Sequence, residues 1–259
     1  MLSASTVARL EPVRRCTVGV PMTRSPSTSV GGLGMPLRSL AIHADVMVGT
    51  TMALVGSDAG HVVHLDARRI RPLADSAPGV PADSLNASAT LTNPHFKYAS
   101  HAGAVNAIVA NPHLPSLFAT LGQDGKVLIH RLFKDMPLLR IQPAALSSSS
   151  PNPTPLLSGA WSPSRPGLLA VTSTDTLYLI SICGSDPGTV VAQLSLPCTG
   201  PLLFHPTLPL LYVGVIENGA SGMRVVRLAA SALKLGDMEV RVKEMTELGR
   251  MIGGDNNDE

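Results

Sequence analysis

The sequence repeats one short proline-containing pattern three times. Each copy has two prolines three positions apart and then, at once or after one residue, a short apolar run; the copies span residues 111–120, 162–171 and 205–214. Their spacings of roughly 51 and 43 residues match the period of a four-stranded propeller blade, which is about 40–50 residues. The repeat therefore predicts an all-β chain in which each copy belongs to one blade.

The best-preserved unit predicts three strands in a row. Residues 105–110 read as a first strand, and the prolines that follow favour a turn because proline cannot donate to a strand ladder. Residues 117–121 and 126–132 read as the next two strands. The intervening Gln123-Asp124-Gly125 predicts a hairpin turn, since glycine readily adopts positive φ.

The other units follow the same plan. The next one places its first strand before Trp161, its hairpin turn at residues 174–176 and its third strand at residues 177–182. An earlier unit shows a strand, an Asp58-Ala59-Gly60 turn and another strand over residues 52–65. About four blades are recognisable, fewer than the seven that usually close a propeller, so we expect an incomplete ring.

Composition agrees with this fold and argues against several others. The chain has 22 prolines and 23 glycines among 259 residues, which disfavours a helical bundle, and 44% hydrophobic residues, which suffice for a core. Because the net charge is only +2 and aromatic residues make up 3%, the composition predicts neither nucleic acid nor an anionic membrane as a partner. We also expect no membrane span, since no apolar run approaches the ~20 residues that a spanning helix needs.

The pattern divides the chain into four parts. We expect a disordered segment at residues 1–35, whose arginine and serine content also resembles a mitochondrial transit peptide. A partial propeller follows over residues 36–230, with long loops at 71–94 and 143–155. Residues 231–252 predict an amphipathic helix with Met238, Val242, Met245, Leu248 and Ile252 at helical spacing, although residues 238–243 could instead form a strand. We expect the tail at residues 253–259 to be disordered.

Three polar residues form the most specific candidate set. His101, Thr120 and Asp124 supply an imidazole, a hydroxyl and a carboxylate, the groups of a catalytic triad, but no G-x-S-x-G motif accompanies them. The preferred interpretation is a structural blade network, to which we also assign Asp58, Asp175 and Trp161. The sequence predicts no catalytic residue, no cofactor and no metal site, because it lacks nucleotide-binding loops and metal-ligand spacings.

These residues resemble WD-repeat blades, in which a histidine, a serine or threonine, an aspartate and a tryptophan form a hydrogen-bonded network; here His130 lies at the tryptophan position. Residues 161–170, with the sequence W-S-P-S-R-P-G-L-L-A, resemble a W-S-P-x-R/H-P-x-x-F-A stretch of dynein intermediate chains. Residues 53–60 and 101–105 resemble two further landmarks of that family, in the same order. The intermediate chain of intraflagellar-transport dynein is the branch most similar to this chain, while axonemal and cytoplasmic ones remain open.

The resemblance implies a non-enzymatic scaffold that corresponds to the C-terminal part of the family's propeller. Its expected partners are the dynein heavy chain, a second intermediate chain and dynein light chains, in the cytoplasm, the cytoskeleton and the cilium. Arg68, Arg69, Lys126 and Arg165 are the expected partner-binding residues. Two alternatives remain open: a WD-repeat adaptor in another multiprotein assembly, and a hydrolase that uses His101 and Asp124.

Overall fold

The computed structural model describes residues 37–45, 50–66, 96–144, 154–231 and 233–253. The expected disordered N-terminal segment, the loop at 71–94, most of the loop at 143–155 and the residues after 253 lie outside the described residues. Arg68 and Arg69 lie outside them as well. The predictions made for these parts of the chain therefore stay predictions.

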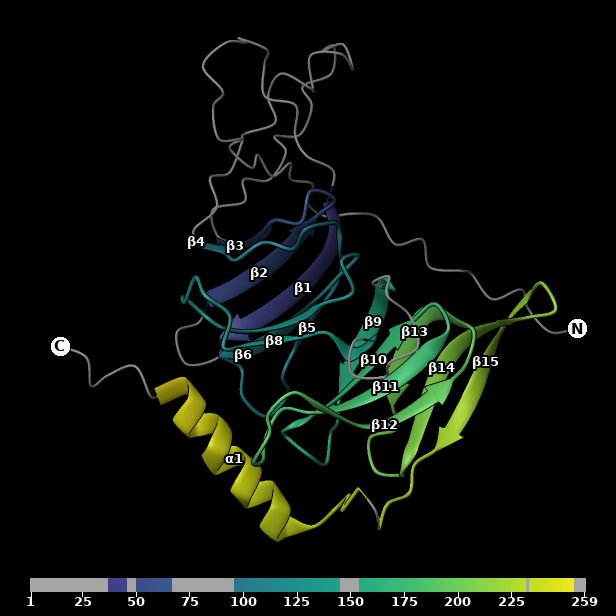
Figure 1. The fold of residues 1–259 in the computed structure, drawn as a ribbon. Helices are drawn as coiled ribbons and strands as arrows, with labels where there is room; N and C mark the ends of the chain where they lie inside the picture. The colour runs from purple at the N-terminus through teal and green to yellow at the C-terminus, as the bar shows by residue number, and fades with distance from the viewer. Residues whose placement is uncertain (1–36, 46–49, 67–95, 145–153, 232, 254–259) are drawn as a thin grey trace, which may run out of the picture.

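The described residues form fifteen strands in four antiparallel sheets and one helix (Figure 1). Blade 1 comprises β1 (Leu37–Asp45), β2 (Thr50–Ser57), β3 (Val62–Asp66) and β4 (Phe96–Tyr98). Blade 2 comprises β5 (Val105–Ala110), β6 (Leu117–Gly122), β7 (Val127–Arg131) and β8 (Leu139–Ile141). Blade 3 comprises β9 (Leu156–Trp161), β10 (Leu168–Ser173), β11 (Thr176–Ser181) and β12 (Thr189–Ser195). Blade 4 has β13 (Cys198–Phe204), β14 (Leu210–Glu217) and β15 (Ala220–Arg227).

The hairpin turns within the blades follow from local sequence. Gly125 has a φ of 73° in the turn between β6 and β7, as the sequence predicts. In the turn between β14 and β15, Asn218 and Gly219 have φ values of 52° and 78°. Two successive positive φ angles match the twist of the flanking strands, and Asn-Gly is the pair that adopts them most readily.

The blades stand side by side in a row, and apolar cores fill the spaces between them. The first strands β1, β5, β9 and β13 lie next to one another in chain order. Alternating side chains of each blade point to opposite faces: Phe118 packs toward blade 1, whereas Leu117, Ala119 and Leu121 pack toward blade 3. This arrangement confirms the predicted all-β fold with the architecture of an incomplete WD-repeat propeller.

The turn after each first strand is held by one side chain at an equivalent position. Asn111 Oδ1, Ser162 Oγ and His205 Nδ1 each accept hydrogen bonds from the backbone N–H groups two and three residues further on, at 2.8–3.3 Å. An amide, a hydroxyl and an imidazole thus accept equivalent pairs of backbone hydrogen bonds in three blades. The repeat therefore conserves an acceptor atom at this position and not a residue type.

The C-terminal segment forms helix α1 (Met238–Gly253), so the alternative of a strand at residues 238–243 is wrong. Asp237 caps it, since its Oδ1 accepts the N–H groups of Glu239 and Val240 at 3.0 and 3.3 Å. The predicted apolar face needs a correction. Met238 and Val242 are 64% and 61% exposed, whereas Leu248 is buried in the core between blades 2 and 3. No described helix has the length and hydropathy that a membrane crossing would require.

The helix is rotated so that its acidic residue Glu244 faces blade 3. Glu244 is buried because Arg165 pairs with it, donating from both Nε and a terminal nitrogen to Glu244 Oε1. The other carboxylate oxygen accepts the N–H of Gly167 at 3.2 Å. At the far end of the helix, Arg131 of blade 2 donates to the carbonyl of Ile252. Helix α1 thus bridges blades 2 and 3.

Arg165→Ala should strongly destabilise the fold, because it leaves the buried carboxylate of Glu244 without its cation. Loss of one partner of a buried pair costs about 3–5 kcal/mol. Arg224→Ala is the matched control, since it removes an exposed pair with Glu217 whose contribution is below about 1 kcal/mol. Urea unfolding of the variants measures both effects. Equal losses for the two variants would contradict a structural role for the Arg165–Glu244 pair.

Candidate functional site: the histidine network and the blade junctions

The structure brings His101, Thr120 and Asp124 together inside blade 2. His101 precedes β5, Thr120 lies on β6 and Asp124 lies in the hairpin turn between β6 and β7. His101 Nδ1 is 2.9 Å from Asp124 Oδ1, and His101 Nε2 is 2.8 Å from Thr120 Oγ1. Asp124 also accepts the N–H groups of Ala102 and Lys126, at 3.1 and 3.2 Å. The carboxylate therefore fastens both the hairpin turn and the loop that leads into β5.

The direction of each hydrogen bond follows from the groups present. Because a carboxylate can only accept, His101 Nδ1 carries a hydrogen and its Nε2 accepts the hydroxyl hydrogen of Thr120. The Thr120 oxygen then accepts from His130 Nε2, which lies 3.2 Å away on β7. The result is one directed chain from His130 through Thr120 and His101 to Asp124.

His130 takes the tryptophan position by presenting a ring N–H. Its ring stacks on Phe118 with centroids 5.0 Å apart and meets Tyr98 edge-on at 5.6 Å. It is fully buried, and its Nδ1 has no hydrogen-bond partner among the residues that the structure describes. Burial lowers the pKa of His130 to about 3, with smaller contributions from Arg140 and from His101 when its ring is protonated. The ring is therefore neutral at physiological pH and acts as a donor, as an indole would.

Burial also lowers the pKa of His101, and the bond to Asp124 offsets only part of this effect. For Asp124, burial acts to raise the pKa, but hydrogen bonds from Ala102 and His101 outweigh it and hold the pKa below its ordinary value. A neutral imidazole beside an ionised carboxylate can polarise a hydroxyl. The Thr120 hydroxyl, however, is fully buried and has two ring-nitrogen partners, so no substrate reaches it.

The packing around the network leaves no room for substitution at Gly122. A Cβ atom at that position would collide with His101 Nδ1 and with Asp124 Oδ1. The strand residue opposite the imidazole must therefore lack a side chain. This close approach indicates that the set braces the blade.

The other residues assigned to the network lie elsewhere. Asp175 sits in the β10–β11 turn of blade 3, where its Oδ1 accepts the Ser173 hydroxyl at 2.9 Å. Asp58 lies exposed in the β2–β3 turn. Trp161 lies between blades 2 and 3, 6% exposed, and donates from Nε1 to the carbonyl of Val109 at 3.1 Å. They are thus separate structural positions and not members of one site.

The junction between blades 2 and 3 is fastened by polar side chains that the sequence analysis did not single out. Asn111 Nδ2 donates to the carbonyl of Pro166 at 3.0 Å, and His113 Nε2 donates to the carbonyl of Ser162 at 3.0 Å. Alignment of the three repeats could have revealed both, because they occupy the turn that each proline pair marks. In the next blade the same two positions are Ser162 and Ser164.

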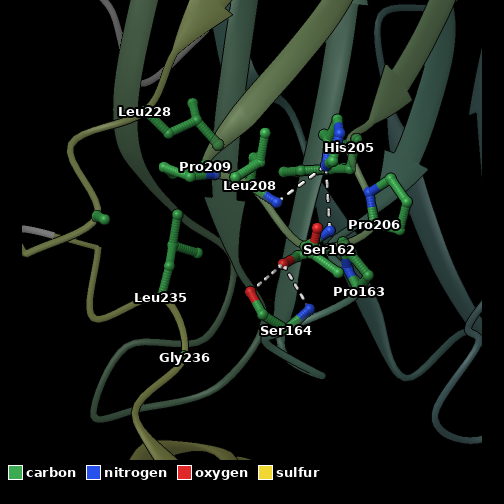
Figure 2. A pocket seen from close by; sticks show the side chains of 13 residues that line it. Ser162, Pro163, Ser164, His205, Pro206, Leu208, Pro209, Leu228, Leu235 and Gly236 are labelled. Atoms are coloured by element: carbon green, nitrogen blue, oxygen red, sulfur yellow. Dashed lines mark hydrogen bonds between the residues drawn. The ribbon is translucent and has the colours of Figure 1, made fainter.

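A small pocket lies at the junction between blades 3 and 4, where these serines replace the longer side chains (Figure 2). It has a volume of about 110 Å³ and is lined by Ser162, Ser164, His205, three prolines and several leucines. Figure 2 shows the Ser162 and Ser164 hydroxyls facing each other on one side. Their oxygens are 3.3 Å apart. Since ligand pockets usually measure about 300–1,000 Å³, this space suits one small side chain and not a cofactor.

The expected partner-binding residues have different surroundings. Arg165 is 13% exposed and engaged within the chain by Glu244 and by the carbonyl of Leu233, so the expectation that it faces a partner needs correction. Lys126 lies half-buried beside the β6–β7 turn. Among the described residues, no cluster of three histidine, cysteine, aspartate or glutamate side chains could hold a metal ion.

Comparison with known proteins adds little to this picture. No family model matches the chain, and no curated protein matches its sequence. Among solved structures, a chain of the mitotic checkpoint complex is similar, with 14% sequence identity and a TM-score of 0.45. The similarity covers 68% of this chain and 51% of that chain, about half its length. The fold assignment accordingly rests on the four sheets themselves.

His101→Ala should lower the free energy of unfolding by about 1–3 kcal/mol, because it leaves Thr120 and Asp124 without their shared partner. His61→Ala is the control, since His61 is partly exposed and its ring forms a hydrogen bond with the exposed Ser100 hydroxyl. Chemical denaturation measures both variants. A His101→Ala protein as stable as the parent would contradict the bracing role and reopen the hydrolase alternative.

The buried histidines should make the fold sensitive to acid. The unfolded chain takes up protons at His101 and His130 below about pH 6.5, whereas the folded chain resists protonation at both positions, down to about pH 3 at His130. The stabilisation that depends on the two neutral histidines is therefore fully present above pH 6.5. The free energy of unfolding falls as the pH drops, by up to ~1.4 kcal/mol per pH unit for each histidine. The free energy of unfolding of His130→Phe, measured across this range, should depend less steeply on pH than that of the parent. An equally steep dependence would contradict the lowered pKa assigned to His130.

Proposed function

We propose that this protein is a non-catalytic scaffold subunit of a dynein motor complex that binds the tail of the heavy chain. In this role it supports microtubule-based transport, with retrograde transport in cilia as the favoured setting. Motor force would come from the heavy chain. A second intermediate chain and dynein light chains are the further proposed partners, in the cytoplasm, the cytoskeleton and the cilium.

The observation that carries the scaffold role is the sealed histidine network. The residues that could have performed acid–base chemistry are buried and consumed in fastening a turn, with Thr120 fully buried and His101 5% exposed. What the described part of the chain offers to other molecules is the edges, turns and faces of its sheets. Such a WD-like fold suits protein–protein interaction, because its blades hold many surface positions in fixed relation.

The resemblance in residues 161–170 supports the choice of the dynein family. In the structure this stretch contributes Trp161 to the core between blades 2 and 3, Ser162 to the turn and Arg165 to the contact with helix α1. The stretch that resembles dynein intermediate chains is therefore a structural junction. The resemblance therefore supports a shared blade architecture. Binding to the dynein heavy chain is the part that we propose.

A tagged pull-down of the endogenous protein, read by mass spectrometry, tests the proposal. We expect the dynein heavy chain and light chains among the recovered partners. Lys126→Gln should reduce recovery of the heavy chain several-fold. Lys126 is the expected partner-binding residue that remains, because Glu244 engages Arg165 and because Arg68 and Arg69 lie outside the described residues. Lys97→Gln, which removes an exposed lysine on β4 of blade 1, is the matched control.

Two results would count against the proposal. Recovery of another assembly with no dynein subunit would replace the motor complex with a different WD-repeat adaptor role. Equal heavy-chain recovery by the parent and by both lysine variants would retain the complex but remove Lys126 from its interface. Thermal unfolding of each variant shows whether a loss of binding merely reflects a loss of folding.

A further inference from the structure

Blade 4 stands at one end of the row of described blades (Figure 1). It exposes apolar side chains on the face turned away from blade 3. We call this the open face, and it comprises Leu203, Tyr212, Ile216, Met223 and Val225. Leu203 and Met223 are 64% and 66% exposed, and Val225 and Ile216 are 53% and 49% exposed. Leu203, Tyr212 and Val225 are direct cross-strand neighbours, so the surface is continuous.

The same positions are buried at the two preceding junctions. Strand register makes three cross-strand pairs equivalent: Ala119–Ile129 in blade 2, Ala170–Leu179 in blade 3 and Tyr212–Val225 in blade 4. Ile129 and Leu179 are at most 4% exposed, because the following blade covers them. Val225 remains apolar but is uncovered. The open face therefore has the composition of a packing surface without its neighbour.

The edge of this sheet is free as well. Blades 1, 2 and 3 each have a fourth strand, β4, β8 or β12, paired with the third. Within the described residues, β15 pairs only with β14, so its outer edge has no partner strand. A long exposed edge beside an apolar face is a surface that a second molecule readily covers.

Charge and area indicate what could cover it. The Arg224–Glu217 ion pair, with a 2.6 Å contact, lies on the other face, since Arg224 pairs with Val213 of the core toward blade 3. The one charged residue that the register of β15 adds to the open face is Arg227, which is exposed at its margin beyond Val225. Two copies can meet about a two-fold axis that crosses β15, because the two Arg227 side chains then lie at opposite ends of the contact. Its exposed apolar area is on the order of 400 Å². One side of a standard interface buries about 600–1,000 Å², of which ~57% is apolar, so the apolar area of the open face falls within the range of roughly 340–570 Å² that such an interface uses.

We propose that the open face of blade 4 is a dimerisation surface, which joins this chain to a second copy of itself through an isologous contact. Met223 and Val225 lie at the centre of the contact. The inference comes from the register and exposure of blade 4, and it does not rest on the motor-complex proposal.

Sedimentation velocity of the full chain over a hundred-fold range of concentration tests this proposal. We expect a monomer–dimer equilibrium, and the Met223→Lys/Val225→Lys double variant should raise its dissociation constant at least ten-fold. The matched control is Met238→Lys/Val242→Lys, which makes the same change at two equally exposed apolar residues of helix α1. The control should dimerise like the parent, and circular dichroism should show that both variants are folded.

A monomer at every concentration would overturn the proposal, as would a dimer that both double variants weaken equally. A third variant keeps the test independent of folding. Val225→Cys, made in a Cys16→Ser background, should form an intermolecular disulfide under mild oxidation, since the remaining cysteines Cys183 and Cys198 are buried. Met238→Cys in the same background should not. Failure of Val225→Cys to crosslink above that control would also overturn the proposal.

Discussion

Each of the four described blades is apolar on both of its faces, and the rest of the structure depends on that property. A sheet with one apolar face can stand with its other face in water, but a sheet with two needs a neighbour on each side. Phe118 and Leu117, adjacent on β6, illustrate this requirement, since they pack into different cores toward blade 1 and blade 3. Stacking in a row satisfies the requirement between the blades, whereas the outward face of blade 4 stays exposed. The outward residues Ala53, Val55 and Val63 of blade 1 are buried.

Apolar stacking alone does not fix how one blade sits on the next, because the hydrophobic effect has no direction. Polar contacts supply that direction here. Asn111, His113 and Trp161 donate across the junction of blades 2 and 3 to backbone carbonyls, which cannot shift without losing these bonds. Helix α1 adds Arg131 from one blade and Arg165 from the next. The register between these two blades is therefore determined by hydrogen bonds and by an ion pair.

The sequence predicts the blades well because their information is local. Proline pairs, Asp-Gly turns and alternating apolar residues determine strands and hairpins within about 30 residues, and these agree with β5–β7 and β9–β11. The contact between Arg165 and Glu244 could not be predicted in the same way, since the two residues are 79 positions apart. Helical spacing placed Met238 and Val242 inward, but the buried ion pair and Leu248 rotate the helix.

The two described junctions on either side of blade 3 show how small differences within a repeat change its mechanics. An amide and an imidazole bridge the first junction, whereas Ser162 and Ser164 are too short to do so and leave a pocket at the second. The two serines still form hydrogen bonds with each other within their own turn, so this turn of blade 3 keeps its conformation. Blade 4 consequently depends more on apolar packing than blades 2 and 3 do. A partner that covers its open face would therefore stabilise blade 4.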